Sequence, residues 1–421
     1  MTTHILQNGN YNDNLKKRKI IRNLCIIATL ESLSYGLMYR FITAHISQRM
    51  GANQIHVGIL QIGLCLGDLI SPEVTNTLTL NYSRRKRLLF ILSVTLLTIL
   101  MIGTPLTPTN YWFVILTRIF FSLINQTQAS LVDLLSKELD SNSYEKLLIK
   151  YNILSKFGLI AGPICAGYLY GIDEGFEKIC SLSAVLTFIN IVILTKTPIQ
   201  EISHEQITAD VNPSIVRKTK QVLMENIKDF EQSDLGTNWD LLLIRYLFVG
   251  SFWVFMAKVR KIMVHHYNIK DPVSAGFTVA FITFLDFIFG YYTSKSHAVS
   301  FKVFPSDSIA DLMLFLATVL MALTIWMPTF QLFLLLTVPV IFIRHEINYI
   351  WPTVFCTRKN VSLYNLNTTT GQLALLTVPL IFGVSYETFG PAVLIIFTCV
   401  PLIFSWIIAR LYTRYLRAKR D

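Results

Sequence analysis

Long runs of apolar residues recur along the whole chain, and they constrain its fold more than any other feature. Of the 421 residues, 52% are hydrophobic and 15% are charged, whereas a soluble domain carries about 25% charged residues. Roughly twelve runs are long enough, as helices, to cross a hydrocarbon core of about 30 Å. They lie near 20–43, 55–80, 87–106, 110–136, 150–171, 177–196, 240–263, 271–293, 306–327, 329–350, 362–386 and 391–414. The sequence therefore predicts an all-α membrane protein with twelve transmembrane helices.

The second half of the chain repeats features of the first half. Pro163 and Gly167 lie late in the first series of apolar runs, and Pro379 and Gly383 lie at the matching place in the second series, with the same spacing. Two further matching pairs of anchors lie upstream: Pro108-Thr109 with Leu116-Thr117, and Pro328-Thr329 with Leu336-Thr337. These matches predict two copies of one membrane unit, as in transporters that bind solute between their halves. A chance match of so short a pattern is the alternative.

A polar stretch divides the chain near its middle. It predicts an N-terminal six-helix bundle over 1–196, a cytoplasmic linker over 197–239 and a C-terminal six-helix bundle over 240–421. Within the linker, 215–231 has apolar residues at an approximately helical spacing. This segment is expected to be either a helix resting on the membrane surface or a solvated linker with some helix.

The net charge of +11 follows mainly from topology. Basic clusters stand before the first run at 16–19, between the second and third runs at 84–87, and near the C-terminus. Since basic residues concentrate in cytoplasmic loops, both termini are expected to be cytoplasmic. No cleavable signal peptide is visible. The charges lie at helix ends and not on one folded face, so no nucleic-acid partner is expected.

One basic cluster breaks this rule. Lys258, Arg260, Lys261 and Lys270, with nearby histidines, follow the seventh run on the side predicted to be external. Either the seventh span is displaced, or the cluster is an exposed patch that attracts anionic solutes toward an opening. The sequence slightly favours the exposed patch, because many other charges set the overall orientation.

Ionisable residues inside apolar runs are costly and mark functional sites or helix contacts. In the first half, Glu31 and Tyr35 lie one turn apart, and Asp68 lies in the second run. Arg118 and Asn125 fall within one sector of a single predicted helix, so this sector is expected to line a cavity or a polar contact. An equal alternative is that Arg118 only locks helices together through Glu31 or Asp68. Asp68 is expected to be a gate contact.

The second half has its own set of intramembrane polar residues. Arg344 and Asn348 lie on one face of the tenth run, and His345 has a pKa range suited to proton coupling. A core histidine with ordinary hydrogen bonds is the alternative. Asp286 in the eighth run is a further candidate coupling acid, with no obvious partner nearby in the sequence.

Small residues and prolines predict close helix packing. Gly158, Gly162 and Gly167 would allow another helix to approach closely, and Pro163 permits bending. The six cysteines lie in or beside apolar runs without a C-x-x-C pair, so they are expected to be free. We find no phosphate-binding loop, metal-ligand spacing or nucleophile motif, and an enzyme is not expected.

Several segments resemble the major facilitator superfamily across nearly the whole chain. Glu31-Ser-Leu-Ser-Tyr-Gly36 resembles the acidic first helix of its drug-antiporter-like branches, and the segment 51–58 resembles the usual start of helix two. Thr117-Arg118 resembles the helix-four segment with its membrane arginine, and Gly162-Pro163 with Gly167 resembles the helix-five pattern of antiporters. The resemblance leans toward tetracycline-antiporter-like and related animal solute carriers, with proton-coupled folate-like carriers as a neighbouring option.

The chain departs from the family pattern between helices two and three. The family loop carries glycine and an acidic residue before a basic run, and the acid takes part in a cytoplasmic gate. Here 75–87 keeps only the basic part, at 84–87.

The resemblance implies that the first and fourth helices of each bundle line a cavity for a solute. The residues placed there are Glu31, Tyr35, Arg118, Asn125, Arg245, Arg344, His345 and Asn348. Residues expected to gate or pack helices are Asp68, Gly158, Gly162, Pro163, Gly167, Pro379 and Gly383. The excess of arginines over acids favours an organic anion or zwitterion as the solute.

The prediction is therefore a secondary active transporter that works by alternating access without a cofactor. It would couple to protons through Glu31 or His345, contact membrane lipid and act as a monomer. A receptor or scaffold with a transporter fold but no flux is the alternative, and an intramembrane enzyme is a more distant one.

Overall fold

The computed structural model describes residues 2–79, 82–103, 110–138, 141–198, 235–300, 306–357 and 362–413. These residues are almost entirely helical, and no strand occurs among them. The predicted surface helix at 215–231 and nearly all of the linker over 197–239 lie outside the described residues, as do Pro108-Thr109 and the last eight residues, 414–421.

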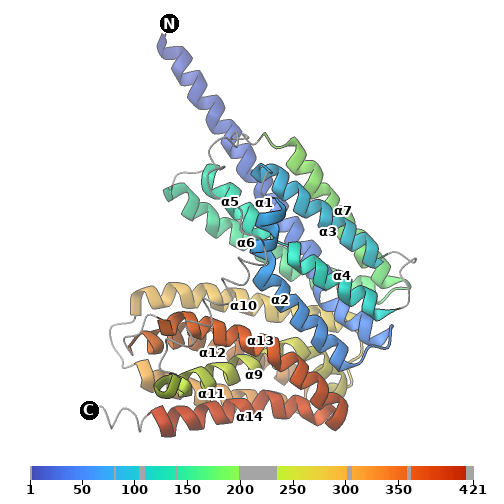
Figure 1. Cartoon of the computed structure of the whole chain (residues 1–421), viewed down its shortest axis with the longest axis vertical. Helices are drawn as coiled ribbons and strands as arrows, with labels where there is room; N and C mark the ends of the chain where they lie inside the picture. Colours follow the sequence, from blue (N-terminus) through green and yellow to red (C-terminus); the bar gives the residue numbers. More distant parts are fainter. Residues whose placement is uncertain are drawn as a thin grey trace. The chain divides into compact units, whose positions relative to one another are not determined.

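The chain forms two compact units, which we describe separately (Figure 1). Unit 1 contains the helices of the first half, and unit 2 contains those of the second half. The helices of unit 1 are α1 (Thr2–Gln48), α3 (Arg84–Gly103), α4 (Tyr111–Ile124), α5 (Thr127–Glu138), α6 (Ser141–Tyr170) and α7 (Gly175–Lys196). Those of unit 2 are α9 (Leu235–Tyr267), α10 (Pro272–Ser300), α11 (Ser306–Ile325), α12 (Phe330–Thr357), α13 (Ser362–Phe389), η2 (Gly390–Ala392), α14 (Val393–Ile408) and η3 (Ala409–Thr413). Helix α2 (Gln54–Leu78) is shared: Ala52–Leu66 belongs to unit 2, and the helix from Gly67 onward belongs to unit 1.

Helix length and hydropathy agree with a membrane-spanning chain. Nine segments of the described residues are long and apolar enough to cross a membrane, and the last of them, Leu366–Leu411, contains both α13 and α14. Adding α11, whose apolar part Ile309–Ile325 is slightly shorter, and the interrupted pair α4–α5 gives the twelve spans predicted from the sequence.

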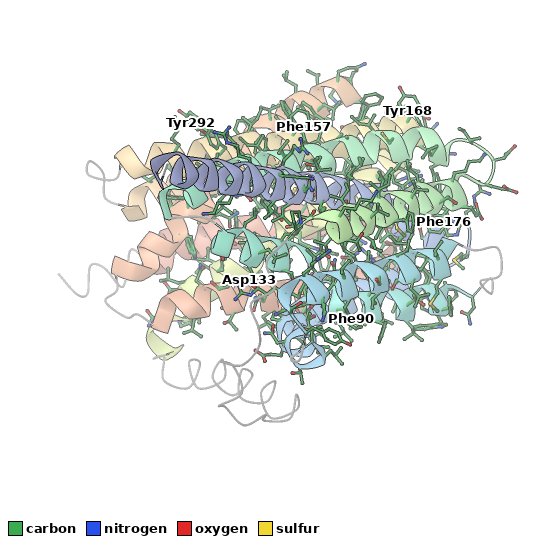
Figure 2. The ribbon with its side chains drawn as sticks, turned by 90° about the horizontal axis from the view of Figure 1, so that it is seen from above. Phe90, Asp133, Phe157, Tyr168, Phe176 and Tyr292 are labelled. Atoms are coloured by element: carbon green, nitrogen blue, oxygen red, sulfur yellow. The ribbon has the colours of Figure 1, made fainter. Side chains whose placement is uncertain are left out.

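Large apolar side chains cover the outside of these helices. Phe157 and Tyr168 of α6 are 65% and 55% exposed, and Trp326 at the end of α11 is 71% exposed. Figure 2 labels Phe157 and Tyr168 on the same helix. A soluble monomer rarely exposes so much apolar surface, whereas acyl chains of a bilayer would cover it.

In unit 1, helix α1 packs directly against the backbone of α6. A Cβ atom added to Gly158 would lie 2.4 Å from the carbonyl oxygen of Thr29, and one on Gly162 would lie 2.6 Å from the carbonyl carbon of Gly36. Side chains cannot fit between helices at such distances, so the two glycines set how closely α1 and α6 approach. Pro163 and Gly167, also buried, continue the same helix.

Helix α7 runs antiparallel to α1 on another side. The Asn23 amide donates to the Thr197 hydroxyl (3.0 Å), the Ser34 hydroxyl donates to the Ser183 carbonyl (3.3 Å), and the His45 ring stacks on Phe176 (3.8 Å between ring centres). These contacts fix the register of α7 against α1 from end to end.

Unit 2 has a core built around α9. Helix α9 packs against α13 and α14, and α11 packs against α12 and α14, as Figure 1 shows in yellow to red. Phe255 of α9 and Phe333 of α12 are fully buried with ring centres 6.1 Å apart. Helix α13 continues past Pro379 and ends where Gly390, with a φ of +73°, lets the chain turn into α14.

The cysteine prediction is confirmed for five of the six residues. Cys25, Cys65, Cys165, Cys180 and Cys399 are free thiols within the described ranges.

Filling the α1–α6 contact should destabilise the protein. We expect Gly158→Ala to lower the stability by about 1–3 kcal/mol, because the added methyl group meets backbone atoms that cannot move independently. Gly171→Ala is the control, since its Cβ would lie 3.6 Å from the nearest atom. Thermal unfolding of the purified variants in detergent measures both, and equal midpoints would contradict the packing role of Gly158.

The start of α10 leads to a second prediction, which concerns how stability depends on pH. Asp271 precedes Pro272, and its carboxylate accepts hydrogen bonds from the backbone N–H of Ser274 (2.8 Å), the Ser274 hydroxyl (2.8 Å) and the N–H of Val273 (3.2 Å). These bonds hold the pKa of Asp271 below its ordinary value. The cap therefore contributes fully above the unfolded pKa of about 3.9 and is lost as the pH falls through the folded value.

We expect Asp271→Ala to cost about 1 kcal/mol at neutral pH and progressively less in acid. Asp271→Asn is the matched control, because an amide caps the helix without titrating. Unfolding midpoints measured at neutral and acidic pH give the comparison. A cost for the alanine variant that does not change with pH would rule out the charged cap.

Candidate functional site

The fourth span of the first half is interrupted, so the prediction of one helix over 110–136 was wrong. Helix α4 ends at Ile124, where Asn125 leaves the helical conformation with a ψ of 83°, and α5 begins at Thr127. The Thr127 hydroxyl donates to the Asn125 side-chain oxygen (3.1 Å). The carbonyl oxygen of Ile124 accepts from the backbone N–H of Gln126 (2.8 Å) and from the Thr75 hydroxyl (3.3 Å). Asparagine and threonine compete with helical hydrogen bonds in this way. A non-helical turn inside a membrane needs such protein partners.

Arg118 lies one and a half turns before this break and is buried among aromatic rings. Its guanidinium carbon lies 4.8 Å from the centre of the Phe121 ring and 5.7 Å from that of Tyr35, which stacks on Tyr39. The carboxyl groups of Glu31 and Asp68 attract it electrostatically, although neither forms an ion pair with it in the described part of the chain. Arg118 therefore combines cation–π contacts to two rings with electrostatic attraction to two carboxyl groups.

Glu31 lies 7% exposed inside α1, with a carboxyl oxygen that lacks a hydrogen-bond partner among the described residues. The amide of Asn190 on α7 lies beside it, and the hydroxyl of Tyr151 on α6 lies within its electrostatic range. Neither the Asn190 amide nor the Tyr151 hydroxyl forms a hydrogen bond of normal geometry within the described residues. Buried polar atoms are rarely left unsatisfied, so this group, which we call the Glu31 cluster, is a candidate site for a proton or ligand.

Asp68 lies in the second half of α2, next to the close contact of this helix with α4. Its neighbour Gly67 packs so closely against Ser122 that a Cβ atom there would overlap the serine hydroxyl. The carboxyl group of Asp68 attracts Arg118. The structure thus places Asp68 next to the candidate site of unit 1, and its predicted gating role stays a prediction.

In unit 2, a single carboxylate binds two neighbouring residues of α12. Oδ1 of Asp286 on α10 accepts hydrogen bonds from Arg344 (2.6 Å) and His345 (2.9 Å). Gly290, one turn after Asp286, makes room for the His345 ring, since a Cβ there would lie 3.3 Å from it. Glu346 points elsewhere and accepts a hydrogen bond from Thr293 (3.1 Å).

Arg245 of α9 lies near this group and has a different partner. Its Nη1 donates to the side-chain oxygen of Asn348 (2.6 Å), one turn beyond Arg344 on α12. The charges of Arg245 and Arg344 repel each other. We call Arg245, Asp286, Arg344, His345 and Asn348 the arginine cluster.

The first half of α2 docks on α9 and α13 through close backbone contacts. A Cβ on Gly383 would lie 2.7 Å from the carbonyl oxygen of Gln54, and one on Gly58 would lie 2.7 Å from that of Pro379. The backbone N–H of Gln54 donates to Glu387 (2.5 Å). Pro379 and Gly383 therefore lie at a contact between α13 and the first half of α2.

The exposed basic patch predicted after the seventh run was wrong for Lys258. Helix α9 continues to Tyr267, and Lys258 is only 6% exposed. Its ammonium group lies over the rings of Phe382 (5.1 Å) and Trp253 (5.5 Å) and donates to the side chain of Gln54 (3.4 Å). Aromatic rings that stabilise a cation allow the helix to carry this lysine inside the protein, which charge counting alone does not detect.

The structure brings together some predicted site residues and not others. Glu31, Tyr35 and Arg118 share one neighbourhood, and Arg245, Arg344, His345 and Asn348 share another. Asn125 instead caps a helix end. Sequence reasoning missed Asn190 and Tyr151, although a lone amide in the apolar run 177–196 was a usable signal.

Two units of apolar helices, each enclosing a charged polar cluster, define a polytopic membrane protein with the architecture of a solute carrier. The chain belongs to the Major Facilitator Superfamily, whose family model matches residues 24–357. Comparison with curated protein sequences gives no match.

Solved structures of transporters share this fold at low sequence identity. The nucleoside transporter NupG has a TM-score of 0.69 at 13% identity, covering 93% of this chain and 99% of its own. A bacterial homologue of the human lysosomal transporter Spinster has a TM-score of 0.67 at 13% identity, covering 95% and 98%. The human organic anion transporter MFSD10 has a TM-score of 0.58 at 11% identity, covering 94% and 99%. These similarities establish the fold and not the solute.

The shared oxygen of Asp286 yields a prediction for unit 2. We expect Asp286→Asn to lower the stability by about 1–3 kcal/mol, because it removes the negative charge that neutralises Arg344. The pair is about one-third exposed, which keeps the loss below that of a fully buried pair.

The double variant Asp286→Asn with Arg344→Gln tests this origin. If the ion pair is responsible, the double variant is more stable than the sum of the two single losses implies. Thermal unfolding of the four proteins completes the cycle, and strictly additive losses would disprove the coupling.

Proposed function

We propose that the chain is a secondary active transporter that moves a small organic solute across a membrane by alternating access, coupled to protons. Membership of a transporter superfamily gives the class. The observation that carries the coupling is the Glu31 cluster, in which a buried intramembrane carboxyl group has an unpartnered oxygen beside an unpartnered amide.

Protonation offers a physical reason for this arrangement. An ionised carboxylate only accepts hydrogen bonds, whereas a protonated one also donates a hydrogen bond, which the Asn190 side-chain oxygen can accept. Loss of the proton leaves a charge that attracts Arg118 on α4. The protonation state of Glu31 thus changes which of its neighbours it binds, as a coupling site requires.

His345 is the second candidate for proton coupling. Its ring shares Oδ1 of Asp286 with Arg344, so a protonated ring would be an additional cation at that carboxylate. Imidazole titrates within the physiological range. Each half of the chain thus has one candidate coupling residue.

The charge balance supports an organic anion or zwitterion as the solute. In the arginine cluster, two guanidinium groups, those of Arg245 and Arg344, are accompanied by one carboxylate, that of Asp286, which binds Arg344. In unit 1, Arg118 lies within electrostatic range of the carboxyl groups of Glu31 and Asp68. Guanidinium groups bind carboxylates and phosphates well because their parallel N–H groups match two oxygens.

The rest of the proposal follows the sequence. Bundles over 1–196 and 240–421 flank a cytoplasmic linker over 197–239, both termini face the cytoplasm, and the protein acts as a monomer in lipid without a cofactor. Asp68, Gly158, Gly162, Pro163, Gly167, Pro379 and Gly383 form the gating and packing set.

A receptor or scaffold with this fold but no flux is the second candidate. The missing acid between α2 and α3 favours it. The basic run nevertheless keeps an acidic partner, because Arg84 forms an ion pair with Asp133 of α5 (3.0 Å). Figure 2 labels Asp133. Solute-dependent thermal stabilisation without uptake would support the receptor function.

We would test flux by reconstituting the protein in liposomes and screening organic anions, cations and neutral metabolites. Uptake that needs an inward proton gradient supports the proposed carrier. Uptake that ignores the gradient would contradict proton coupling, and binding without uptake would contradict transport.

Glu31→Gln separates coupling from solute binding. We expect it to abolish uptake driven by a pH gradient, at least tenfold, while exchange of solute across the membrane continues, because the amide retains hydrogen bonding and cannot titrate. The matched control is Glu174→Gln at an exposed turn before α7. Loss of both gradient-driven uptake and exchange, or of neither, would contradict the assignment of proton coupling to Glu31. His345→Gln would then be tested in the same assay.

A further inference from the structure

The guanidinium group of Arg245 has few hydrogen-bond partners for a cation inside a membrane span. Of its five N–H groups, one donates to Asn348, and Nε is buried without a hydrogen-bond partner among the described residues. The positive charge of Arg344 repels it. A cation within a membrane span is costly unless it binds an anion or a polar group. Among the described residues, no carboxylate forms a hydrogen bond or ion pair with this cation.

The other cation of the cluster is already neutralised. Asp286 binds Arg344 and His345 through the same oxygen, Oδ1. Two guanidinium groups and one carboxylate leave one positive charge in excess when His345 is neutral. This excess belongs to Arg245, whose only hydrogen-bond acceptor in the described residues is a neutral amide.

Helix α13 leaves space beside this guanidinium group. A Cβ atom on Gly371 would lie 3.7 Å from both Nε and Nη2 of Arg245, so any side chain there would contact the group directly. One turn earlier on the same face, Asn367 is 4% exposed, and its side-chain oxygen has no hydrogen-bond partner within the described ranges. A buried unpartnered acceptor thus accompanies the unpartnered donors.

The internal repeat provides a second, independent reason to single out Arg245. Arg245 stands five residues before Gly250, which packs against Val378, the residue before Pro379. Glu31 stands five residues before Gly36, which packs against Gly162, the residue before Pro163. Arg245 therefore occupies in unit 2 the position that the buried acid occupies in unit 1.

We propose that Arg245, with Asn348 as its amide partner, Gly371 beside it and Asn367 one turn from Gly371, is the subsite for an oxyanion group of the solute, such as a carboxylate or phosphate. The anion binds the Nε–Nη2 edge of the guanidinium group, which has two parallel donors. A donor group of the solute next to the anion pairs with Asn367. This inference rests on the proposed transport function, because it defines what the solute must carry.

The test uses the purified full chain in detergent and follows its thermal unfolding. The probes are sodium benzoate and sodium phosphate, with choline chloride as the cation, all at constant ionic strength. We expect a saturable rise of the unfolding midpoint with at least one of the two anions and none with choline.

Three variants locate the binding. Arg245→Lys should weaken the anion affinity at least tenfold, because an ammonium group cannot bind two oxygens in parallel. Arg410→Lys is the matched control in the same unit, since Arg410 is exposed and already lies near Asp311 (3.9 Å). Gly371→Ala should weaken binding several-fold while the protein stays folded, because its new methyl group would be at ordinary contact distance.

Each outcome decides the proposal. Saturable stabilisation that persists in Arg245→Lys and Gly371→Ala would overturn it, as would the absence of anion stabilisation in the unmodified protein. Anion binding without flux in liposomes would support the subsite and contradict transport. Uptake restricted to cations would overturn the subsite and leave the transport function intact.

Discussion

The backbone-to-backbone contact between α1 and α6 is the constraint on which unit 1 depends. Gly158 and Gly162 bring two helices together without intervening side chains. Lipid tails are as apolar as leucine, so helices in a membrane gain little from burying apolar side chains, and close van der Waals contact becomes the main attraction. Once α1 is fixed against α6, the hydrogen bonds from Ser34 to α7 set the remaining register. The position of Glu31 beside Asn190 and Tyr151 follows from those two contacts.

The equivalent pair of helices also packs in unit 2, where a valine side chain meets the glycine. Gly250 of α9 receives Val378 of α13 where Gly36 of α1 receives Gly162 of α6, and the helix that carries it has an arginine in place of the acid. A repeat of this kind preserves the packing positions, which are set by geometry, and lets the polar positions diverge. The two units therefore share one framework and carry opposite charges at equivalent points. That difference is the basis for assigning the proton to one and the anionic group to the other.

Several polar groups of this chain are stable in the membrane only because of partners distant in the sequence. Asp286 binds residues 58 and 59 positions away, and Lys258 binds Gln54 across 204 positions and lies over Phe382. At the break after Ile124, the carbonyl oxygen of Ile124 accepts hydrogen bonds from the Gln126 N–H and from Thr75 of another helix. Breaks and charges of this kind are tolerated in a membrane where protein replaces water as the hydrogen-bonding partner.

The sequence by itself determined the spans, the family and the identity of most candidate residues, because hydrophobic length and intramembrane charge are local properties. It also indicated that Gly158 and Gly162 allow close packing. Only the tertiary structure decided that Lys258 is buried, that the fourth span is broken at Asn125, and that Asp286 neutralises Arg344 and not Arg245. Each of these depends on which helices meet, and at which turn, and a pattern within one helix does not contain that information.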